Sequence, residues 1–178
     1  MSRFPVLAVV LALVATGCGS DNDVSPSPTQ PNKIVFTAAL SALNEVPALA
    51  AGNAELGGRG AATVTFNVTR DAAGNITAGT VDVSATFTGF PNGTVVTLTH
   101  IHRGDSATMG AVVIGTVPSA GEVTMPNGFG SYVHGGFPIG PPVDIANEVI
   151  ANPAAFYFNV HTPTNPSGAA RGQLVRVP

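Results

Sequence analysis

The sequence predicts an all-β protein that folds as a single-domain, antiparallel Greek-key β-sandwich or barrel. Short runs of β-branched and aromatic residues are separated by Gly- and Pro-rich turns, and only residues 144–151 read as a helix. The chain has 178 residues, of which 44% are hydrophobic and 10% are charged, so it can bury one core. Its formal net charge of −3 leaves no basic surface for a nucleic-acid partner.

Residues 1–17 are typical of a lipoprotein signal peptide. Arg3 precedes an apolar run over residues 6–14, which is too short to span a bilayer as a finished helix. The only cysteine, Cys18, follows small residues as in a bacterial lipobox, where the cysteine is lipidated and becomes the new N-terminus. The alternative is an ordinary signal peptide that is cleaved near Gly17 and leaves Cys18 unmodified.

A polar, proline-broken segment over residues 18–32 follows the signal peptide. Such a composition buries no apolar surface, so we expect a lipid-anchored, disordered tether in front of a folded domain of residues 33–178. The expected location is the cell envelope, with the membrane as a partner through the lipid anchor. Gly19 after Cys18 resembles the signal for the outer membrane of a Gram-negative cell.

The first half of the domain predicts a long hairpin. Residues 34–36 open the domain, and residues 48–60 form an irregular segment that is rich in Ala and Gly. Residues 62–68 and 76–87 then alternate apolar and polar side chains, and the Asp- and Gly-containing stretch between them favours a turn. A tight turn at residues 91–93 leads into the next strand, which ends in histidines.

The second half of the domain predicts shorter elements. The apolar run 111–114 suits a strand that is covered on both faces, and residues 118–142 read as a short hairpin followed by a long loop. Residues 144–151 predict a helix that Pro153 ends. The last expected elements are a strand over residues 156–161, a turn over residues 163–168 and a strand over residues 172–177.

Three of the four histidines can share one ligand. His100 and His102 are two residues apart in a β-run, so their rings point to the same side of the strand. His161 ends a second run, and His134 in the Gly-rich stretch is a further candidate. Imidazole nitrogens suit copper, zinc and iron alike, so His100, His102 and His161 are candidate ligands for a transition-metal cofactor, and the pattern does not choose the metal.

A structural role is the first interpretation of the same histidines, and metal binding is the second. A histidine at a strand end commonly donates to a backbone carbonyl, and Thr99, Asn159 and Thr162 could complete such a network. A pairing of Glu45 with Arg171 would pin the first segment of the domain to the last strand. The polar residues that we expect to support the cluster are Glu45, Asn159, Arg171 and Gln173.

Several motifs, taken in order, resemble the CHRD domain, a family named from chordin. They are Asn44-Glu45-Val46-Pro47, the His-Ile-His run and the glycine that follows it, Asn159-Val160-His161-Thr162, Asn165-Pro166-Ser167-Gly168 and Arg171-Gly172-Gln173. The resemblance spans about residues 34–176 and implies a β-rich fold, but no reaction. In chordin the domain occurs within an extracellular antagonist of a growth factor, so the resemblance implies an extracytoplasmic protein ligand as one class of partner.

Two classes of function stay open. The first is a non-enzymatic binding module held at the membrane, which the tether and the lack of an acid–base or nucleophile motif favour. The second is a histidine-ligated copper, zinc or iron protein with redox activity, because a His-X-His strand in a Greek-key fold resembles the copper site of copper-zinc superoxide dismutases. No catalytic residue is assigned. Arg103-Gly104-Asp105 spells an adhesion tripeptide, which we interpret as a chance match.

Overall fold

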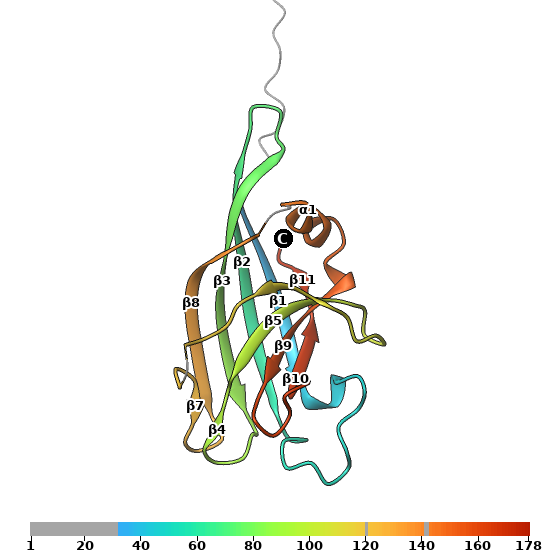
Figure 1. Cartoon of the computed structure of the whole chain (residues 1–178), viewed down its shortest axis with the longest axis vertical. Helices are drawn as coiled ribbons and strands as arrows, with labels where there is room; N and C mark the ends of the chain where they lie inside the picture. Colours follow the sequence, from blue (N-terminus) through green and yellow to red (C-terminus); the bar gives the residue numbers. More distant parts are fainter. Residues whose placement is uncertain (1–31, 120, 141–142) are drawn as a thin grey trace, which may run out of the picture.

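The computed structural model describes residues 32–119, 121–140 and 143–178, and it confirms an all-β, antiparallel fold (Figure 1). The predicted signal peptide, Cys18 and all but the last residue of the predicted tether lie outside the described residues. The strands are β1 (Lys33–Ser41), β2 (Arg59–Arg70), β3 (Ile76–Thr88), β4 (Thr94–Val95), β5 (Leu98–Arg103), β6 (Val112–Gly115), β7 (Thr124–Met125), β8 (Gly130–Pro138), β9 (Phe156–His161), β10 (Ala170–Gln173) and β11 (Val175–Arg176). The helical elements are η1 (Ala42–Asn44), α1 (Asp144–Ala151) and η2 (Pro153–Ala155).

In the part of the chain that the structure describes, no helix has the length and apolar character needed to cross a membrane.

In the described residues, one sheet of nine strands forms most of the fold. Its order is β6-β5-β9-β10-β1-β2-β3-β8, with β11 also paired to β1, while β4 and β7 form a separate pair. The sheet curls round into a nearly closed barrel (Figure 1). Because β9 and β10 are inserted between β5 and β1, the His-X-His strand lies directly beside the strand that ends in His161. The topology therefore brings the two halves of the predicted histidine cluster together.

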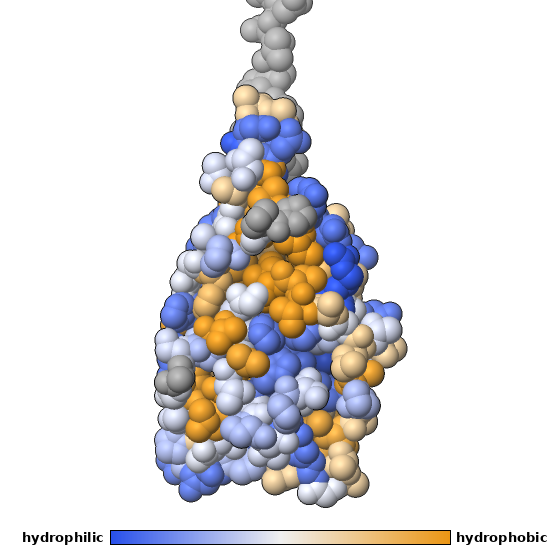
Figure 2. Space-filling model, viewed as in Figure 1, coloured by the Kyte–Doolittle hydropathy of each residue, from blue (hydrophilic) through white to orange (hydrophobic). Residues whose placement is uncertain are grey.

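The hydrophobic core lies inside the curled sheet. Val64 and Phe66 of β2 are fully buried, as the alternation of the hairpin predicts, and Phe36 of β1 packs edge-on against Phe66 with ring centroids 5.4 Å apart. Helix α1 adds Ala146 and Val149 to the same core. Apolar side chains also reach the surface in the upper middle of the face that Figure 2 shows.

Two segments differ from the sequence-based expectation. The run 111–114 was expected to be covered on both faces, but β6 is the edge strand of the sheet, so Val112 is 48% exposed and only Ile114 is buried. Residues 118–142 were expected to form a short hairpin and a long loop, but they contain the nine-residue strand β8, which pairs with the otherwise free edge of β3. In both segments the burial and the secondary structure depend on which strand lies alongside, and local composition does not reveal that strand.

Candidate metal centre

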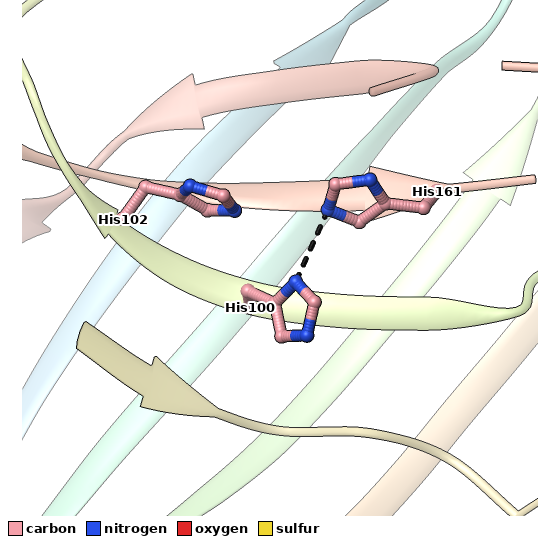
Figure 3. Close-up of side chains that lie close together, drawn as sticks. All are labelled: His100, His102 and His161. Carbon is pink, nitrogen blue, oxygen red and sulfur yellow. Dashed lines mark hydrogen bonds between the residues drawn. The ribbon is translucent and has the colours of Figure 1, made fainter. Parts of the chain in front are cut away.

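His100, His102 and His161 lie on the outer face of the sheet, where β5 and β9 run side by side (Figure 3). The register places His100 opposite Asn159, which is two residues before His161 on the same face of β9. The residue between the first two histidines, Ile101, points the other way and is buried in the core. The period-two alternation of both strands therefore directs all three rings to one side of the sheet, as predicted.

The three rings are close enough to bind one ion. Each offers a ring nitrogen, and these nitrogens all lie within 4.8 Å of one another. His100 Nδ1 and His161 Nε2 are 3.2 Å apart (Figure 3). Two ligands of a tetrahedral metal with bonds of about 2.05 Å are separated by about 3.4 Å, so this pair already has the spacing of neighbouring ligands. Bringing the widest pair to that spacing requires a movement of about 1.4 Å, which side-chain rotation can supply.

Backbone carbonyls fix which nitrogens are free on two of the rings. His102 Nδ1 lies 2.9 Å from the carbonyl oxygen of Gly110, and His161 Nδ1 lies 3.1 Å from that of Pro166. Because a carbonyl oxygen only accepts hydrogen bonds, both Nδ1 atoms carry the proton and both Nε2 atoms keep a lone pair. His102 Nε2 is buried and has no hydrogen-bond partner among the residues that the structure describes. The structural interpretation of the histidines accounts for the Nδ1 contacts but not for this nitrogen.

The surroundings keep all three histidines neutral at pH 7. Burial, together with the charges that His161 and His102 carry when protonated, lowers the pKa of His100 to about 4. Burial also lowers the pKa of His102, with a further lowering by the Arg171 charge, although the bond to Gly110 opposes the shift. Burial is again the largest cause of the lowered pKa of His161. Neutral rings have lone pairs available for a metal, so little proton competition is expected near pH 7.

A buried arginine holds the loop that supplies the Gly110 carbonyl. Arg171 is 1% exposed and lies with its guanidinium carbon 4.3 Å from the centroid of the Tyr157 ring, whose plane is stacked on His102 with the two centroids 5.0 Å apart. The Tyr157 hydroxyl accepts a hydrogen bond of 3.2 Å from the Gly110 amide. The Arg171 guanidinium donates to the backbone carbonyls of Asn44 (2.7 Å), Thr108 (2.8 Å), Ser106 (2.9 Å) and Asp105 (3.3 Å). This packing fixes both the ring plane of His102 and its carbonyl acceptor.

The predicted supporting residues gather beside the histidines, but they interact differently from the expectation. Glu45, Arg171 and Gln173 line one cavity of about 280 Å³. Asn44 makes the link between the first segment and the last strands, because its side chain donates to the Arg171 carbonyl while Arg171 donates to the Asn44 carbonyl. Burial raises the pKa of Glu45 to about 7, against the opposing effects of the Arg171 charge and the Asn159 amide.

Other predicted residues lie away from the three rings. His134 is on β8, where its Nδ1 lies 3.4 Å from Glu122 Oε1, and it does not belong to the three-histidine group that the described residues form. Thr99 is fully buried and donates to the Thr116 carbonyl, so it is not part of a network with the histidines. Arg103 of the adhesion-like tripeptide pairs with Glu148 of α1.

Sequence reasoning missed the groups that orient the rings. Tyr157 alternates with Asn159 and His161 along β9, and that spacing was the available signal for its place on the same face. Gly110 and Pro166 act through backbone carbonyls, which no side-chain pattern reveals. The contacts between loops that bring these carbonyls to the rings are long-range and appear only in the folded chain.

Comparison with known proteins supports the motif resemblance. A family model described as the CHRD domain matches residues 36–174. That span includes all three histidines, Arg171 and most of the sheet. Comparison with curated proteins gave no match, and comparison with solved structures gave none. Because the matched span covers well over half of the chain, this protein belongs to the CHRD domain family.

Proposed function

We propose that this CHRD domain is a non-enzymatic binding module that holds one transition-metal ion through His100, His102 and His161. The observation that carries the proposal is the buried Nε2 of His102, which has no hydrogen-bond partner within the described part of the chain and faces two other imidazoles whose nitrogens lie within 4.8 Å. A buried polar atom without a partner calls for a ligand, and three converging imidazoles are a common metal ligand set.

The donor set favours copper or zinc over iron. Non-haem iron(II) centres typically combine two histidines with a carboxylate, whereas the group formed here consists of three histidines. Three neutral ligands leave the charge of the ion uncompensated, and they leave a fourth coordination position for water or a small anion. The bonds from Nδ1 of His102 and His161 to backbone carbonyls are the outer contacts that typically orient metal-binding histidines.

Redox activity of the superoxide-dismutase kind is the second candidate. It is favoured by the same His-X-His strand, because an open position on a copper ion would admit a small oxidant or reductant. The discriminating observation is which metal the protein selects, since zinc does not change its oxidation state. Copper selection with superoxide-dependent turnover would support this candidate, and zinc selection would exclude it.

Metal titration of tag-free protein tests the proposal. We expect one zinc or copper ion per chain by equilibrium dialysis, and we expect saturating metal to stabilise the fold by about 2.7 kcal/mol at a free concentration of 100 times Kd. His102→Ala should lose this binding, while His134→Ala is the matched control because its ring lies outside the group. If the protein binds no metal, or if both variants lose metal equally, the proposed site is wrong.

We further propose that the domain is exported and anchored to the membrane through a lipid on Cys18. The proposal is supported by the lipobox-like residues before Cys18 and the polar stretch that follows it. Cys18→Ser should give a soluble or uncleaved protein, because a hydroxyl does not form the thioether of this pathway. If Cys18→Ser stays in the detergent phase at the mature size of the parent, the anchor is not on Cys18.

A further inference from the structure

A second buried cluster lies beside the turn that follows His161. Its centre is Glu55, a residue of the irregular Ala- and Gly-rich segment, and this side chain is only 1% exposed. Glu55 Oε2 accepts a hydrogen bond of 2.7 Å from the Thr162 hydroxyl and one of 2.6 Å from the Asn165 side chain. Asn53 closes the cluster, because its side-chain amide donates to the Asn165 side-chain oxygen over 2.6 Å.

The two residues that Glu55 binds flank the contact that orients His161. Thr162 follows His161 directly, and Asn165 directly precedes Pro166, whose carbonyl accepts from His161 Nδ1. The backbone amide of Asn165 also donates to the Thr162 hydroxyl over 3.0 Å. One carboxylate oxygen of Glu55 therefore holds both Thr162 and Asn165, the two ends of this turn. The positions of the His161 ring and of its acceptor, the Pro166 carbonyl, both depend on the turn.

We propose that Glu55 is a positioning residue for His161. By holding the turn, Glu55 keeps the Pro166 carbonyl against Nδ1, so the proton stays on Nδ1 and the Nε2 lone pair points toward His100 and His102. A buried carboxylate is stabilised only when it receives hydrogen bonds, and Glu55 receives its side-chain bonds from residues of this one turn. The expected effect on metal affinity rests on the proposed metal site. The positioning of the His161 ring does not depend on that site.

The test compares the His161 ring in variants of Glu55. Glu55→Leu leaves the donors of Thr162 and Asn165 without their acceptor, whereas Glu55→Gln keeps an acceptor oxygen in the same place. Long-range ¹H–¹⁵N spectra of the metal-free protein report which ring nitrogen carries the proton. We expect Nδ1 protonation in the parent and in Glu55→Gln, and a mixture of tautomers in Glu55→Leu. Zinc affinity should fall about 10-fold in Glu55→Leu and recover in Glu55→Gln.

Phe66→Leu is the control for lost stability alone, because Phe66 is buried in the core away from this turn. If Glu55→Leu keeps a single Nδ1-protonated tautomer and binds zinc like Phe66→Leu, the proposal is wrong. Should Glu55→Leu fail to fold, Thr162→Val removes one of the two donors, and an unchanged His161 spectrum in that variant also overturns the proposal. A parent protein that binds neither zinc nor copper would refute the metal site and leave the ring spectra as the test of Glu55.

Discussion

The β2–β3 hairpin and strand β9 belong to one sheet, but their outer faces have different environments. Along β2 and β3 buried residues alternate with residues that are exposed or partly exposed, because only the inner face is covered. All six residues of β9 are buried. The inner face of β9 adds Phe158 to the core, while its outer face carries Tyr157, Asn159 and His161 beneath packed loops.

The difference shows where the fold places polar chemistry. An outer face that is open to water needs no special hydrogen bonds, whereas a covered outer face with polar side chains requires a partner for each polar atom. For Nδ1 of His102 and of His161 those partners are backbone carbonyls in two loops, one of which is held by Arg171 and the other by Glu55. Replacing one type of polar side chain should therefore lower the free energy of unfolding strongly near β9 and only weakly on the hairpin.

The largest contrast is expected between two arginines. Arg171→Leu removes the four hydrogen bonds that this buried, charged guanidinium donates to partly buried backbone carbonyls, and it should lower the free energy of unfolding by about 3 to 5 kcal/mol. Arg59→Leu on β2 is the matched control, because Arg59 is exposed and donates to the Ser41 hydroxyl at the surface, so its cost should stay below about 0.5 kcal/mol. Urea denaturation of both variants measures the contrast, and equal losses would contradict it.

Two glycines with positive φ give a smaller contrast. Gly74 in the hairpin turn has a φ of 86° and open space where a Cβ would be, so Gly74→Ala should cost only the backbone strain of about 1 to 2 kcal/mol. Gly168 has a φ of 147°, and a Cβ there would lie 2.5 Å from Glu45 Oε2 and 2.8 Å from Asn159 Nδ2. Gly168→Ala should therefore lower the thermal midpoint further than Gly74→Ala. A smaller loss at Gly168 would show that the Glu45 side chain moves freely.

The smallest expected effect is a change of stability with pH in the metal-free protein. The pKa of His100 is about 4 in the folded chain against an ordinary 6.5, so between these values the unfolded chain binds more protons and stability falls as the pH is lowered. The pKa of Glu45 is about 7 against an ordinary 4.5, so its contribution falls as the pH rises through that window. Because the two windows overlap between about pH 4.5 and pH 6.5 and the two effects have opposite signs, they largely cancel in the parent; His100→Gln should therefore reduce the loss of stability on acidification and Glu45→Gln should increase it, as measured by urea denaturation between pH 4 and pH 8. If neither variant changes the profile, these two side chains are not the source of its slope.

Much of the fold follows from local patterns. The alternation along residues 62–68 and 76–87 predicted β2 and β3, and the residues of α1 matched the expected helix over residues 144–151. The edge position of β6 and the pairing of β8 were missed, because both depend on which strand lies alongside. Sequence periodicity reports how one segment is buried, but it does not identify the neighbour.

The candidate site, like the fold, was predictable only where the pattern lies within one segment. The spacing of His100 and His102 fixed their common direction, and the run that ends in His161 gave the third ring. The roles of Arg171 and Glu55 were not predictable in this form, because each acts on a loop that is distant in sequence. A pairing of Glu45 with Arg171 was the nearest expectation, and the link is made by Asn44 instead.

Anomalous diffraction from crystals of the metal-loaded protein is the most direct measurement of the central claim. With data collected at the zinc or copper absorption edge, we expect one strong peak on the outer face of β5 and β9. The peak should lie about 2.0 to 2.1 Å from one ring nitrogen each of His100, His102 and His161. A peak elsewhere, or no peak at saturating metal, would contradict the account.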